Sequence, residues 1–431
     1  MKVAIVGSGI SGLGCAHALQ AERQHGVRVT LFEAERRLGG HTNTVDVRLD
    51  GIAHPVDTGF LVFNERTYPN LIRLFAELGV PTASSDMSFS VSVPGAGGRR
   101  IEWAGTDMNS VFAQRRNLAS PRFLAMLADI LRFNRQASRI AQGDETAGEQ
   151  TLGEFLDRHR YGESFRRWYL LPMAAAIWSC PMRTMLAYPL ATFVRFCHNH
   201  GLLQLNGRPQ WYTVAGGARQ YVQRIAAQLD DVRRGTPVLE VRRNEAAGKV
   251  SVRTARGIEV FDQVVLACHG DQSAALLADA DDAERQLLAE ARYQPNRAVL
   301  HTDTRLMPRL RQVWSSWNYL SDGKADPHVS VTYLLNKLQP LPFRAPVLLS
   351  LNPLVEPAPE TVIAEFEYSH PIFDARMIEA QQRLPDLQGR RRVWLAGAWT
   401  GYGFHEDGLK SGLAVAAALA SLARSPQRLA A

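Results

Sequence analysis

Three histidines stand where an imidazole could take part in a reaction. His41 follows two glycines, His301 ends an apolar run of β-type residues, and His405 lies in an aromatic-rich segment before an acid-glycine pair. Imidazole titrates near neutral pH, so each ring can accept or release a proton. The three are therefore candidate catalytic residues. Since histidines are also common in cores and edge strands, a structural role stays open for His301.

The first residues have the pattern of a dinucleotide-binding turn. An apolar strand-like run over 2–6 leads into Gly-Ser-Gly-Ile-Ser-Gly at 7–12, where a helical pattern begins. Gly7 permits the turn, Gly9 lets the backbone approach a pyrophosphate, and Gly12 lets the helix pack closely on the strand. The helix N-terminus favours the phosphate charges. The residues predicted to bind at this turn are Gly7, Gly9, Ser11 and Gly12.

An acidic residue stands where such a fold binds a ribose. A second strand-like run, 27–32, ends at Glu33, which follows Gly12 by about 20 residues. A carboxylate there accepts hydrogen bonds from ribose hydroxyls and disfavours a 2′-phosphate. NAD in place of FAD, and a surface glutamate that only ends a strand, are the alternatives.

Two further segments distinguish FAD from NAD. Leu-Gly-Gly-His at 38–41 and Val-Asp-Thr-Gly-Phe at 56–60 follow Glu33 at short range. With the first turn, they make the chain resemble the flavin-containing amine oxidase superfamily, which includes monoamine oxidases, protoporphyrinogen oxidase and carotenoid desaturases. The resemblance implies that the paired glycines pass close to the flavin and its diphosphate. It adds four residues to the expected cofactor site: Gly39, Gly40, Thr58 and Gly59.

The chain departs from that family's pattern at His41. The resembled family usually has a basic residue, an arginine, directly after the paired glycines, and this chain has a histidine. The phosphate contact is therefore open at this position. An imidazole near the flavin could instead tune its redox potential or move a proton.

The resemblance continues into two later segments. Residues 261–268 are similar to the family's second cofactor strand, and Val238 matches a position whose main chain touches adenine. The strand-like run 393–398 and the acid-glycine pair after it are similar to the closing flavin motif. There a helix N-terminus would support negative charge on the reduced flavin ring. The cofactor-binding residues implied are Val238, Ala267, Gly397, Asp407, Gly408, Leu409 and Ser411.

Aromatic residues are expected beside the flavin, because a hydride equivalent must pass in a dry pocket. The candidates for lining a substrate are Phe60, Trp317, Trp399, Tyr402 and Phe404. In the resembled amine oxidases two aromatics frame the substrate nitrogen in this region, and a lysine on a substrate-domain strand is bonded through water to flavin N5. In this resemblance His301 stands at the position of that lysine. For the aromatics, packing against the flavin edge is the alternative.

Together these features predict an α/β fold: a Rossmann-type FAD-binding domain of the glutathione-reductase type, with an interleaved α+β substrate domain and a helical insertion. The FAD-binding domain is expected over 1–90, 207–270 and 386–431, the substrate domain over 91–206 and 271–385, with 105–200 largely helical. No cysteine follows Cys268, so FAD would be held without a cysteinyl link near the C-terminus. The cysteines form no C-x-x-C pair, which predicts a reducing compartment and no metal.

The formal net charge of +7 would suit an anionic partner, either a membrane surface or nucleic acid. A basic amphipathic helix is predicted over 121–135, and such helices lie on anionic lipid or cover a domain core. Its apolar residues are expected on one side: Phe123, Leu124, Leu127, Ile130 and Leu131. No apolar run approaches the ~20 residues that span a bilayer. We expect a cytoplasmic protein and no nucleic-acid partner, with contact to the inner face of an anionic membrane left open and the oligomeric state unknown.

Three functions stay open. The first is desaturation or dehydrogenation of a lipidic chain, in keeping with carotenoid desaturases and with a bacterial branch described as NAD/FAD-binding proteins. Some relatives in that branch introduce unsaturation into methyl-branched fatty acyl chains of phospholipids on the way to furan fatty acids. His41 and His301 replace residues expected of amine oxidases, which favours this function. The alternatives are a flavin oxidase of amines or amino acids that releases hydrogen peroxide, and a flavin-binding protein without catalysis.

Overall fold

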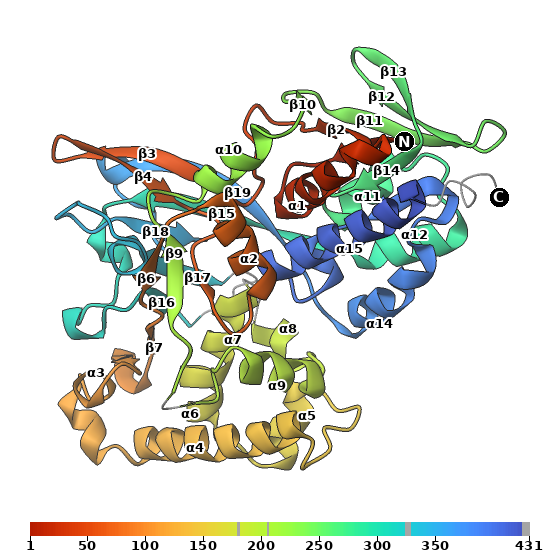
Figure 1. Cartoon of the computed structure of the whole chain (residues 1–431). Helices are drawn as coiled ribbons and strands as arrows, with labels where there is room; N and C mark the ends of the chain where they lie inside the picture. Colours follow the sequence, from red (N-terminus) through yellow and green to blue (C-terminus); the bar gives the residue numbers. More distant parts are fainter. Residues whose placement is uncertain (179–181, 205–206, 324–328, 425–431) are drawn as a thin grey trace.

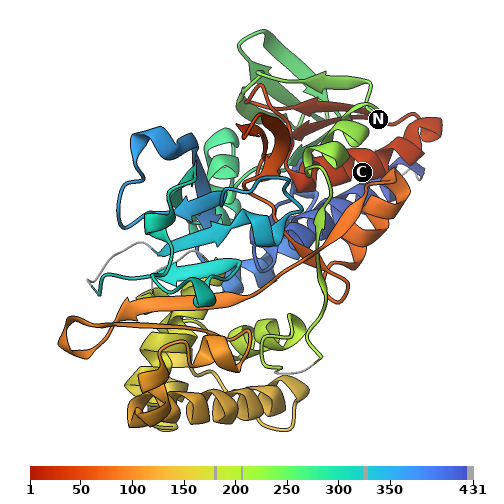
Figure 2. The same cartoon turned by 90° about the vertical axis from the view of Figure 1, so that its left-hand side faces the viewer.

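Two large sheets and a group of helices build the molecule (Figures 1 and 2). The structure, a computed structural model, describes residues 1–178, 182–204, 207–323 and 329–424. Cys180 lies outside these residues. A parallel sheet lies at one end of the molecule and the helices of residues 108–199 at the other, with the larger sheet between them.

The parallel sheet draws its strands from distant parts of the chain. Its order is β10-β2-β1-β14-β20, and every neighbouring pair runs parallel. The strands are β1 (Lys2–Val6), β2 (Arg28–Phe32), β10 (Asp231–Arg233), β14 (Gln263–Leu266) and β20 (Val393–Leu395). Helices α1 (Ile10–Leu19) and α15 (His405–Arg424) pack together beside it (Figure 1). This arrangement confirms the predicted Rossmann-type fold.

A three-stranded meander packs against the same sheet. It consists of β11 (Val238–Asn244), β12 (Lys249–Thr254) and β13 (Gly257–Phe261), and the Phe261 ring meets Phe32 of β2 edge to face at 6.0 Å. Two smaller sheets connect the large ones. They contain β3 (Thr44–Leu49), β4 (Ile52–Asp57), β5 (Phe63–Asn64), β6 (Thr82–Ser85) and β9 (Trp211–Val214), beside helices α2 (Pro69–Leu78) and α10 (Arg219–Ala226).

The seven-stranded sheet belongs to the predicted substrate domain. Its order is β19-β15-β18-β17-β16-β7-β8, antiparallel except for the pair β16 and β7. The strands are β7 (Phe89–Pro94), β8 (Arg100–Ala104), β15 (Tyr293–His301), β16 (Trp317–Leu320), β17 (Ser330–Leu334), β18 (Leu348–Leu351) and β19 (Val362–Pro371). Helix α13 (Leu335–Leu338) follows β17. Because β7 begins at Phe89, this sheet begins just before the expected boundary at 91.

Helices occupy most of the expected insertion. They are α3 (Met108–Val111), α4 (Pro121–Gln142), α5 (Leu152–Arg158), α6 (Glu163–Phe165), a π-helical turn (Arg166–Leu170), α7 (Leu171–Trp178), α8 (Met182–Leu186) and α9 (Leu190–Asn199). The Ser120 hydroxyl accepts from the Phe123 N–H at 3.4 Å and caps α4, with Pro121 in its first turn. We call these helices the helical unit.

One expectation for α4 was wrong. Phe123 and Ile130 are buried as predicted, but Leu124 is 43% exposed and Leu131 is 50% exposed. The apolar residues of α4 therefore do not all face the core: Leu124 and Leu131 lie on its solvent-exposed side. No helix in the described ranges has the length and apolar character of a membrane-spanning segment.

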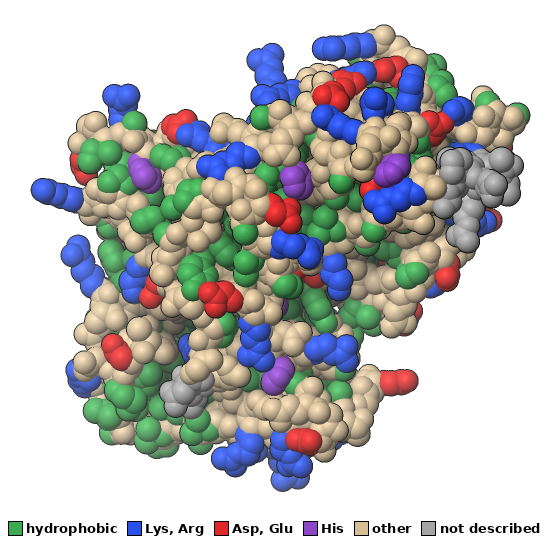
Figure 3. All heavy atoms as spheres, in the orientation of Figure 1, with side chains coloured by type: hydrophobic (Ala, Val, Ile, Leu, Met, Phe, Trp, Pro, Cys, Tyr) green, Lys and Arg blue, Asp and Glu red, His purple; other side chains and the backbone are tan. Residues whose placement is uncertain are grey.

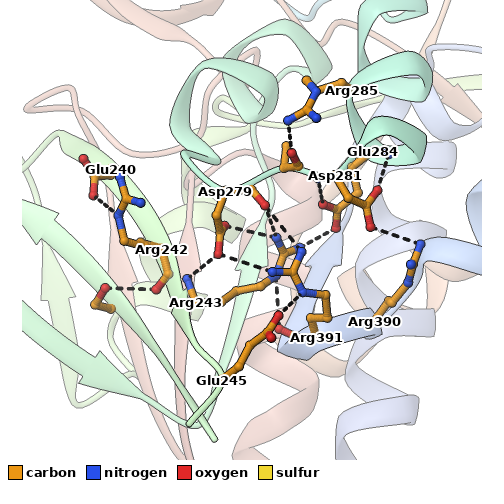
Figure 4. A network of polar contacts seen from close by, with 12 residues as sticks. Glu240, Arg242, Arg243, Glu245, Asp279, Asp281, Glu284, Arg285, Arg390 and Arg391 are labelled. Carbon is orange, nitrogen blue, oxygen red and sulfur yellow. Dashed lines mark hydrogen bonds and ion pairs between the residues drawn. The ribbon is translucent and has the colours of Figure 1, made fainter. Parts of the chain in front are cut away.

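A buried arginine attaches a second part of the chain to the meander (Figure 4). Arg243 of β11 forms ion pairs with Asp279, at 3.1 Å, and with Glu284. These acids belong to the segment containing α11 (Gly270–Leu276) and α12 (Asp282–Glu290), and α12 packs on α14 (Ala375–Arg383). The segment 271–290, expected in the substrate domain, is thus fastened to the FAD-binding side. The exact boundary between the two expected domains stays a prediction.

Short 3-10 helices join the remaining elements. They are η1 (Gln20–His25), η2 (Ala96–Gly98), η3 (Arg115–Ala119), η5 (Thr304–Leu306), η6 (Arg311–Val313), η7 (Pro359–Thr361), η8 (Leu384–Leu387), η9 (Arg390–Arg392) and η10 (Ala398–Thr400). Of these, η10 matters most for the site, because it lies between β20 and α15.

Candidate cofactor and active site

The first glycine turn sits at the carboxyl end of β1, against the end of β14. Gly7 has φ +105°, and a Cβ there would stand 2.6 Å from the carbonyl oxygen of Ala267. A Cβ on Gly12 would overlap the carbonyl oxygen of Gly7. The close approach of α1 to the turn therefore requires glycine at both positions. Ala267, expected in the cofactor site, lies directly beside this turn.

The N-terminus of α1 suits an anion. Its N-cap residue is Gly9, and no side chain caps the helix. A Cβ on Gly9 would meet no protein atom within 4 Å. The first N–H groups of a helix attract negative charge, and the open side of Gly9 leaves room for a phosphate to approach the backbone.

Glu33 is held at the end of β2 next to the same turn. One carboxylate oxygen accepts from the Ser8 N–H at 2.9 Å and from the Ser8 hydroxyl at 2.5 Å. The other accepts from the Glu35 N–H at 2.9 Å. This position at the carboxyl edge of the parallel sheet is where a ribose-binding acid is expected.

The second pair of glycines lies on the first turn. The Gly39 N–H donates to the Ser8 carbonyl at 3.1 Å, and a Cβ on Gly40 would stand 3.2 Å from the Gly9 Cα. The Arg37 side chain is directed at its own loop. Its guanidinium donates to the carbonyls of Gly40, at 2.9 Å, and Thr42, at 3.1 Å. Arg37 therefore stabilises the loop itself.

Thr58 and Gly59 lie directly behind His41. The carbonyl of His41 accepts from the Phe60 N–H at 2.8 Å, and a side chain on Gly59 would overlap that carbonyl oxygen. The Thr58 hydroxyl hydrogen-bonds Tyr368 at 2.8 Å. The structure thus gives both residues a place in holding the loop that carries His41, while their contact with a cofactor stays a prediction.

Three histidines from different parts of the chain gather here. The ring centroid of His41 lies 5.5 Å from that of His370 on β19 and 6.2 Å from that of His269, the residue before α11. We call His41, His269 and His370 the histidine group. Burial and then repulsion from the other two rings lower the pKa of His41 well below its usual range. Burial lowers the pKa of His370 to about 4 and also lowers that of His269.

His405 begins α15 and joins three of the cofactor-facing segments. Its ring stacks on Phe60, with centroids 3.9 Å apart and planes at 11°, and its Nε2 hydrogen-bonds the Tyr221 hydroxyl at 2.7 Å. Tyr221 in turn hydrogen-bonds Thr42, which follows His41. Burial lowers the pKa of His405 to about 3, so its ring is neutral. These contacts favour a positioning role, and a catalytic role of His405 stays a prediction.

The closing motif packs on the first turn. A Cβ on Gly408 would stand 2.9 Å from Ile10 and 3.0 Å from the Ser11 hydroxyl. The Leu409 side chain leaves no room for a Cβ on Gly14 of α1. The two glycine bends, about 400 residues apart in the chain, thus meet at one place as the predicted cofactor site requires.

Two predicted cofactor residues of this motif point their side chains at their own loop. The Asp407 carboxylate accepts from the Phe404 N–H at 3.0 Å, and burial raises its pKa to about 6. The Ser411 hydroxyl accepts from the Gly397 N–H at 3.0 Å and donates to the Gly408 carbonyl at 2.8 Å. Both side chains therefore shape the turn between β20 and α15. Val238 begins β11, and its contact with adenine stays a prediction.

The contacts of His301 favour a structural role, and a catalytic role stays a prediction. Its Nδ1 accepts from the Asp303 N–H at 3.0 Å and its Nε2 donates to the Ser350 hydroxyl at 2.9 Å, so both ring nitrogens are occupied. His301 ends the nine-residue strand β15, whose other end, Tyr293, stacks on His269 at 4.1 Å. At ~3.3 Å per residue the two ends lie ~26 Å apart. Asn296 of β15 also reaches the histidine group, where its amide hydrogen-bonds His370 at 2.9 Å.

The predicted aromatic residues separate into two kinds. Trp399 is 1% exposed and donates to the Cys268 carbonyl at 3.3 Å, so it belongs to the core and lines no open space. Trp317 packs edge to face on Tyr333 within the seven-stranded sheet, at 4.8 Å. By contrast, Tyr402 and Phe404 are only partly buried.

Tyr402 and Phe404 meet the helical unit. Phe196 of α9 stacks on Phe404 at 5.0 Å and lies 5.9 Å from Tyr402, and His200 lies 3.9 Å from Phe196 and 5.6 Å from Phe404. We call Phe196, His200, Tyr402 and Phe404 the aromatic junction. Burial lowers the pKa of His200 to about 4, so this junction carries no charge at neutral pH.

Several of these residues were missed from the sequence: His269, His370, Tyr221, Phe196 and His200. His269 directly follows the predicted cofactor strand, and this position was a signal that could have found it. For the others no local pattern was available, because the pairing of β15 with β19 and the packing of α9 bring them to the site. In the described ranges, no three His, Cys, Asp or Glu side chains gather as metal ligands.

Comparisons with known proteins agree with this geometry. The model of the family of flavin containing amine oxidoreductases matches residues 10–350. A carotenoid phi-ring synthase from Streptomyces griseus is 28% identical over 288 residues, 62% of this chain and 52% of that protein, so the chain spans about half the length of this relative.

Two solved structures show the same fold. The cyclohexylamine oxidase from Brevibacterium oxydans IH-35A has a TM-score of 0.66 at 19% identity, covering 97% of this chain and 98% of that one. The CLA-producing fatty acid isomerase from P. acnes has a TM-score of 0.65 at 15% identity, covering 96% and 98%. The uncapped N-terminus of α1 and the open side of Gly9 fit the diphosphate of FAD. The chain belongs to the flavin containing amine oxidoreductase family, and this membership implies FAD as its cofactor.

Proposed function

We propose that the protein desaturates or dehydrogenates a lipidic chain, such as a fatty acyl chain of a membrane phospholipid. When bound, FAD supplies the acceptor for the hydride equivalent that leaves one carbon, while the neighbouring carbon loses a proton and a double bond forms. The observation that carries the proposal is the aromatic junction, in which Phe196 of the helical unit packs on Phe404 of the loop before α15.

The aromatic junction places a packed, uncharged wall beside the expected flavin site. Tyr402 and Phe404 stand between β20 and α15, and the N-terminus of α15 packs on the turn expected to hold the cofactor. Phe196 and the neutral His200 cover them from the helical unit. Such a wall excludes water, as transfer of a hydride equivalent from a hydrocarbon chain requires.

The outer face of the helical unit suits an anionic bilayer. Met108 is 70% exposed and Leu118 is 55% exposed, and Leu124 and Leu131 of α4 are exposed as well. Figure 3 shows hydrophobic side chains gathered over α3 and α4, with basic side chains beside them. The charged residues between 108 and 142 are Arg115, Arg116, Arg122, Arg132, Arg135 and Arg139, against the single acid Asp129.

Exposed leucines flanked by arginines are the pattern of a surface that rests on anionic lipid. A lipidic substrate leaves a bilayer at a high cost in free energy, so an enzyme that acts on one gains from binding the bilayer next to its active site. Two similar proteins are named for lipidic chemistry, the carotenoid phi-ring synthase and the fatty acid isomerase. Their names support the same substrate class for this chain.

The reaction is tested with the FAD-loaded protein under anaerobic conditions. Phospholipids with saturated, unsaturated and methyl-branched acyl chains are added separately, and bleaching of the flavin absorption reports reduction. We expect bleaching with one lipid class and a product that mass spectrometry shows to have lost two hydrogen atoms. Bleaching and hydrogen peroxide release with a panel of amines, and none with any lipid, would instead establish an amine oxidase.

The membrane contact is tested by flotation with vesicles. We expect binding to vesicles containing an anionic phospholipid and little binding to neutral ones, because the arginines supply about 1 kcal/mol each near an anionic surface. Leu124→Ser with Leu131→Ser should weaken binding. Ile258→Ser is the matched control, since Ile258 is 65% exposed on the meander. Equal binding of the double variant and the wild type would contradict this surface.

A further inference from the structure

His41 follows the paired glycines directly and lies next to the turn expected to hold the diphosphate of FAD. It follows Gly40, whose Cβ position lies 3.2 Å from the Gly9 Cα at the uncapped N-terminus of α1. Its carbonyl is fixed by the N–H groups of Phe60, at 2.8 Å, and Asn43, at 3.0 Å. The backbone of His41 is therefore fixed next to the phosphate-binding turn.

The ring of His41 is available to a ligand. Within the described part of the chain, no group hydrogen-bonds either of its ring nitrogens, in contrast to His370 and His405. The Nδ1 of His370 accepts from the Asn296 amide at 2.9 Å, and Nε2 of His405 is bonded to Tyr221 at 2.7 Å. These bonds hold the His370 and His405 rings in place, whereas no described residue fixes the ring nitrogens of His41 in this way.

The groups that face His41 keep its ring neutral. His370 and Tyr368 face it from β19, His269 from the start of α11, His405 from α15 and Arg37 from its own loop. Burial first, then repulsion from these histidines and from Arg37, lower the pKa of His41 well below its usual range. His269 has Tyr293 stacked on it at 4.1 Å, and Asp271 beside it partly opposes the effect of burial on its pKa.

A bound diphosphate would raise the pKa of His41, because it carries about two negative charges at neutral pH and attracts a proton to a nearby imidazole. We propose that His41 binds the FAD diphosphate as an imidazolium that forms only when the cofactor binds, so that FAD binding takes up a proton. In this role it replaces the arginine that the family usually has after the paired glycines. The inference depends on FAD as cofactor and not on the identity of the substrate.

The sign of the pH effect follows from linkage. If the complex holds one more proton than the separate partners, raising the pH favours dissociation. The Kd of FAD then rises by up to about tenfold per pH unit over the range in which His41 is protonated in the complex and neutral in the free protein. An arginine at 41 carries its charge at every accessible pH, so it should bind FAD without this dependence.

The experiment dilutes the FAD-loaded protein at a series of pH values between about 6 and about 9, the range in which a perturbed imidazolium releases its proton. The fluorescence of released FAD gives the Kd at each pH, and no substrate is present. We expect the wild-type Kd to rise with pH, His41→Arg to bind FAD tightly with no dependence on pH, and His41→Gln to bind weakly with no dependence.

His301→Gln is the matched control, because His301 is a buried histidine at the far end of β15, with a pKa lowered to about 4. It should keep the wild-type dependence. A Kd of the wild-type protein that does not change with pH, or a His41→Arg variant that keeps the wild-type slope, would overturn the proposal. Circular dichroism confirms that each variant is folded, and His41→Gln decides the question if His41→Arg does not fold.

Discussion

The imidazole of His405 lies flat on the ring of Phe60, with 3.9 Å between the ring centroids and 11° between the planes. Phe60 ends the segment that carries Thr58 and Gly59, and His405 is the first residue of α15. The same imidazole hydrogen-bonds Tyr221 of α10. One ring therefore links three segments that are far apart in the chain, and all three contact the loop around His41.

Removal of the His405 ring should loosen the cofactor site. A stacked pair contributes about 1 kcal/mol and a buried hydrogen bond about 1 kcal/mol, so His405→Ala should lower the free energy of unfolding by about 2 kcal/mol and weaken FAD binding. Urea unfolding and the FAD content of the purified protein measure the two effects. Tyr221→Phe, which removes only the hydrogen bond, should have about half the effect on stability. Full FAD content in His405→Ala would exclude the positioning role.

The glycines of the first turn should separate folding from cofactor binding. Gly12→Ala places a methyl group on the Gly7 carbonyl oxygen and should prevent α1 from packing, so little folded protein is expected. Gly9→Ala places a methyl group where no protein atom lies within 4 Å. This variant should fold but bind FAD more weakly. Gly105→Ala is the control, because Gly105 also has free space around its Cβ position but lies near the helical unit. Normal FAD affinity in Gly9→Ala would place the diphosphate elsewhere.

Local patterns in the sequence predicted where the glycine turn and Glu33 lie at the end of the parallel sheet. A strand, a glycine turn and an acid about 20 residues later are all short-range features, and the structure places Gly7 and Glu33 together at the end of the parallel sheet. The meeting of Gly408 with Ser11 followed from the family resemblance and not from any local signal.

The remaining parts of the site depend on tertiary packing. His301 and Asn296 lie on one strand, and only the pairing of β15 with β19 decides that Asn296 is the residue next to His370. Trp399 was expected beside the substrate because it is near the closing motif, but its indole turns inward to the Cys268 carbonyl. Neither the choice of residue along a strand nor the direction of a side chain in a loop can be derived from periodicity.

Asp57 should make stability depend on pH. Burial raises its pKa to about 7, while its carboxylate accepts from the Ala218 N–H at 2.9 Å. Between pH 3.8, its ordinary pKa, and about 7 the folded state keeps a proton that the unfolded state releases. The contribution of Asp57 is therefore fully present below pH 3.8 and is lost as the pH rises to about 7. An asparagine side chain does not titrate. As the pH rises from 3.8 to about 7, the free energy of unfolding of Asp57→Asn should therefore increase relative to that of the wild type. A constant difference in urea unfolding would contradict the prediction.

His301 should prove structural. Its two hydrogen bonds are buried, so His301→Gln should lower the free energy of unfolding by about 1–3 kcal/mol at neutral pH. Since burial lowers the pKa of the folded state from 6.5 to about 4, the contribution of His301 is present above pH 6.5 and is lost as the pH falls to about 4. FAD content and the rate of flavin reduction should equal those of the wild type. A slower reduction at full FAD content would return His301 to the catalytic candidates.

The buried pair of Arg243 and Glu284 gives the sharpest test of what holds the two halves of the FAD-binding side together (Figure 4). Arg243→Met leaves the Glu284 carboxylate buried without its partner, so unfolding should become easier by about 3–5 kcal/mol. Replacing both, as Arg243→Met with Glu284→Leu, removes the isolated charge and should recover a large part of that loss. Arg285→Met is the control, since the pair of Arg285 and Asp282 is exposed and should contribute little. If the double variant were as unstable as Arg243→Met alone, the loss would come from the contact of Arg243 with Asp279 and the Arg391 carbonyl rather than from the buried charge of Glu284.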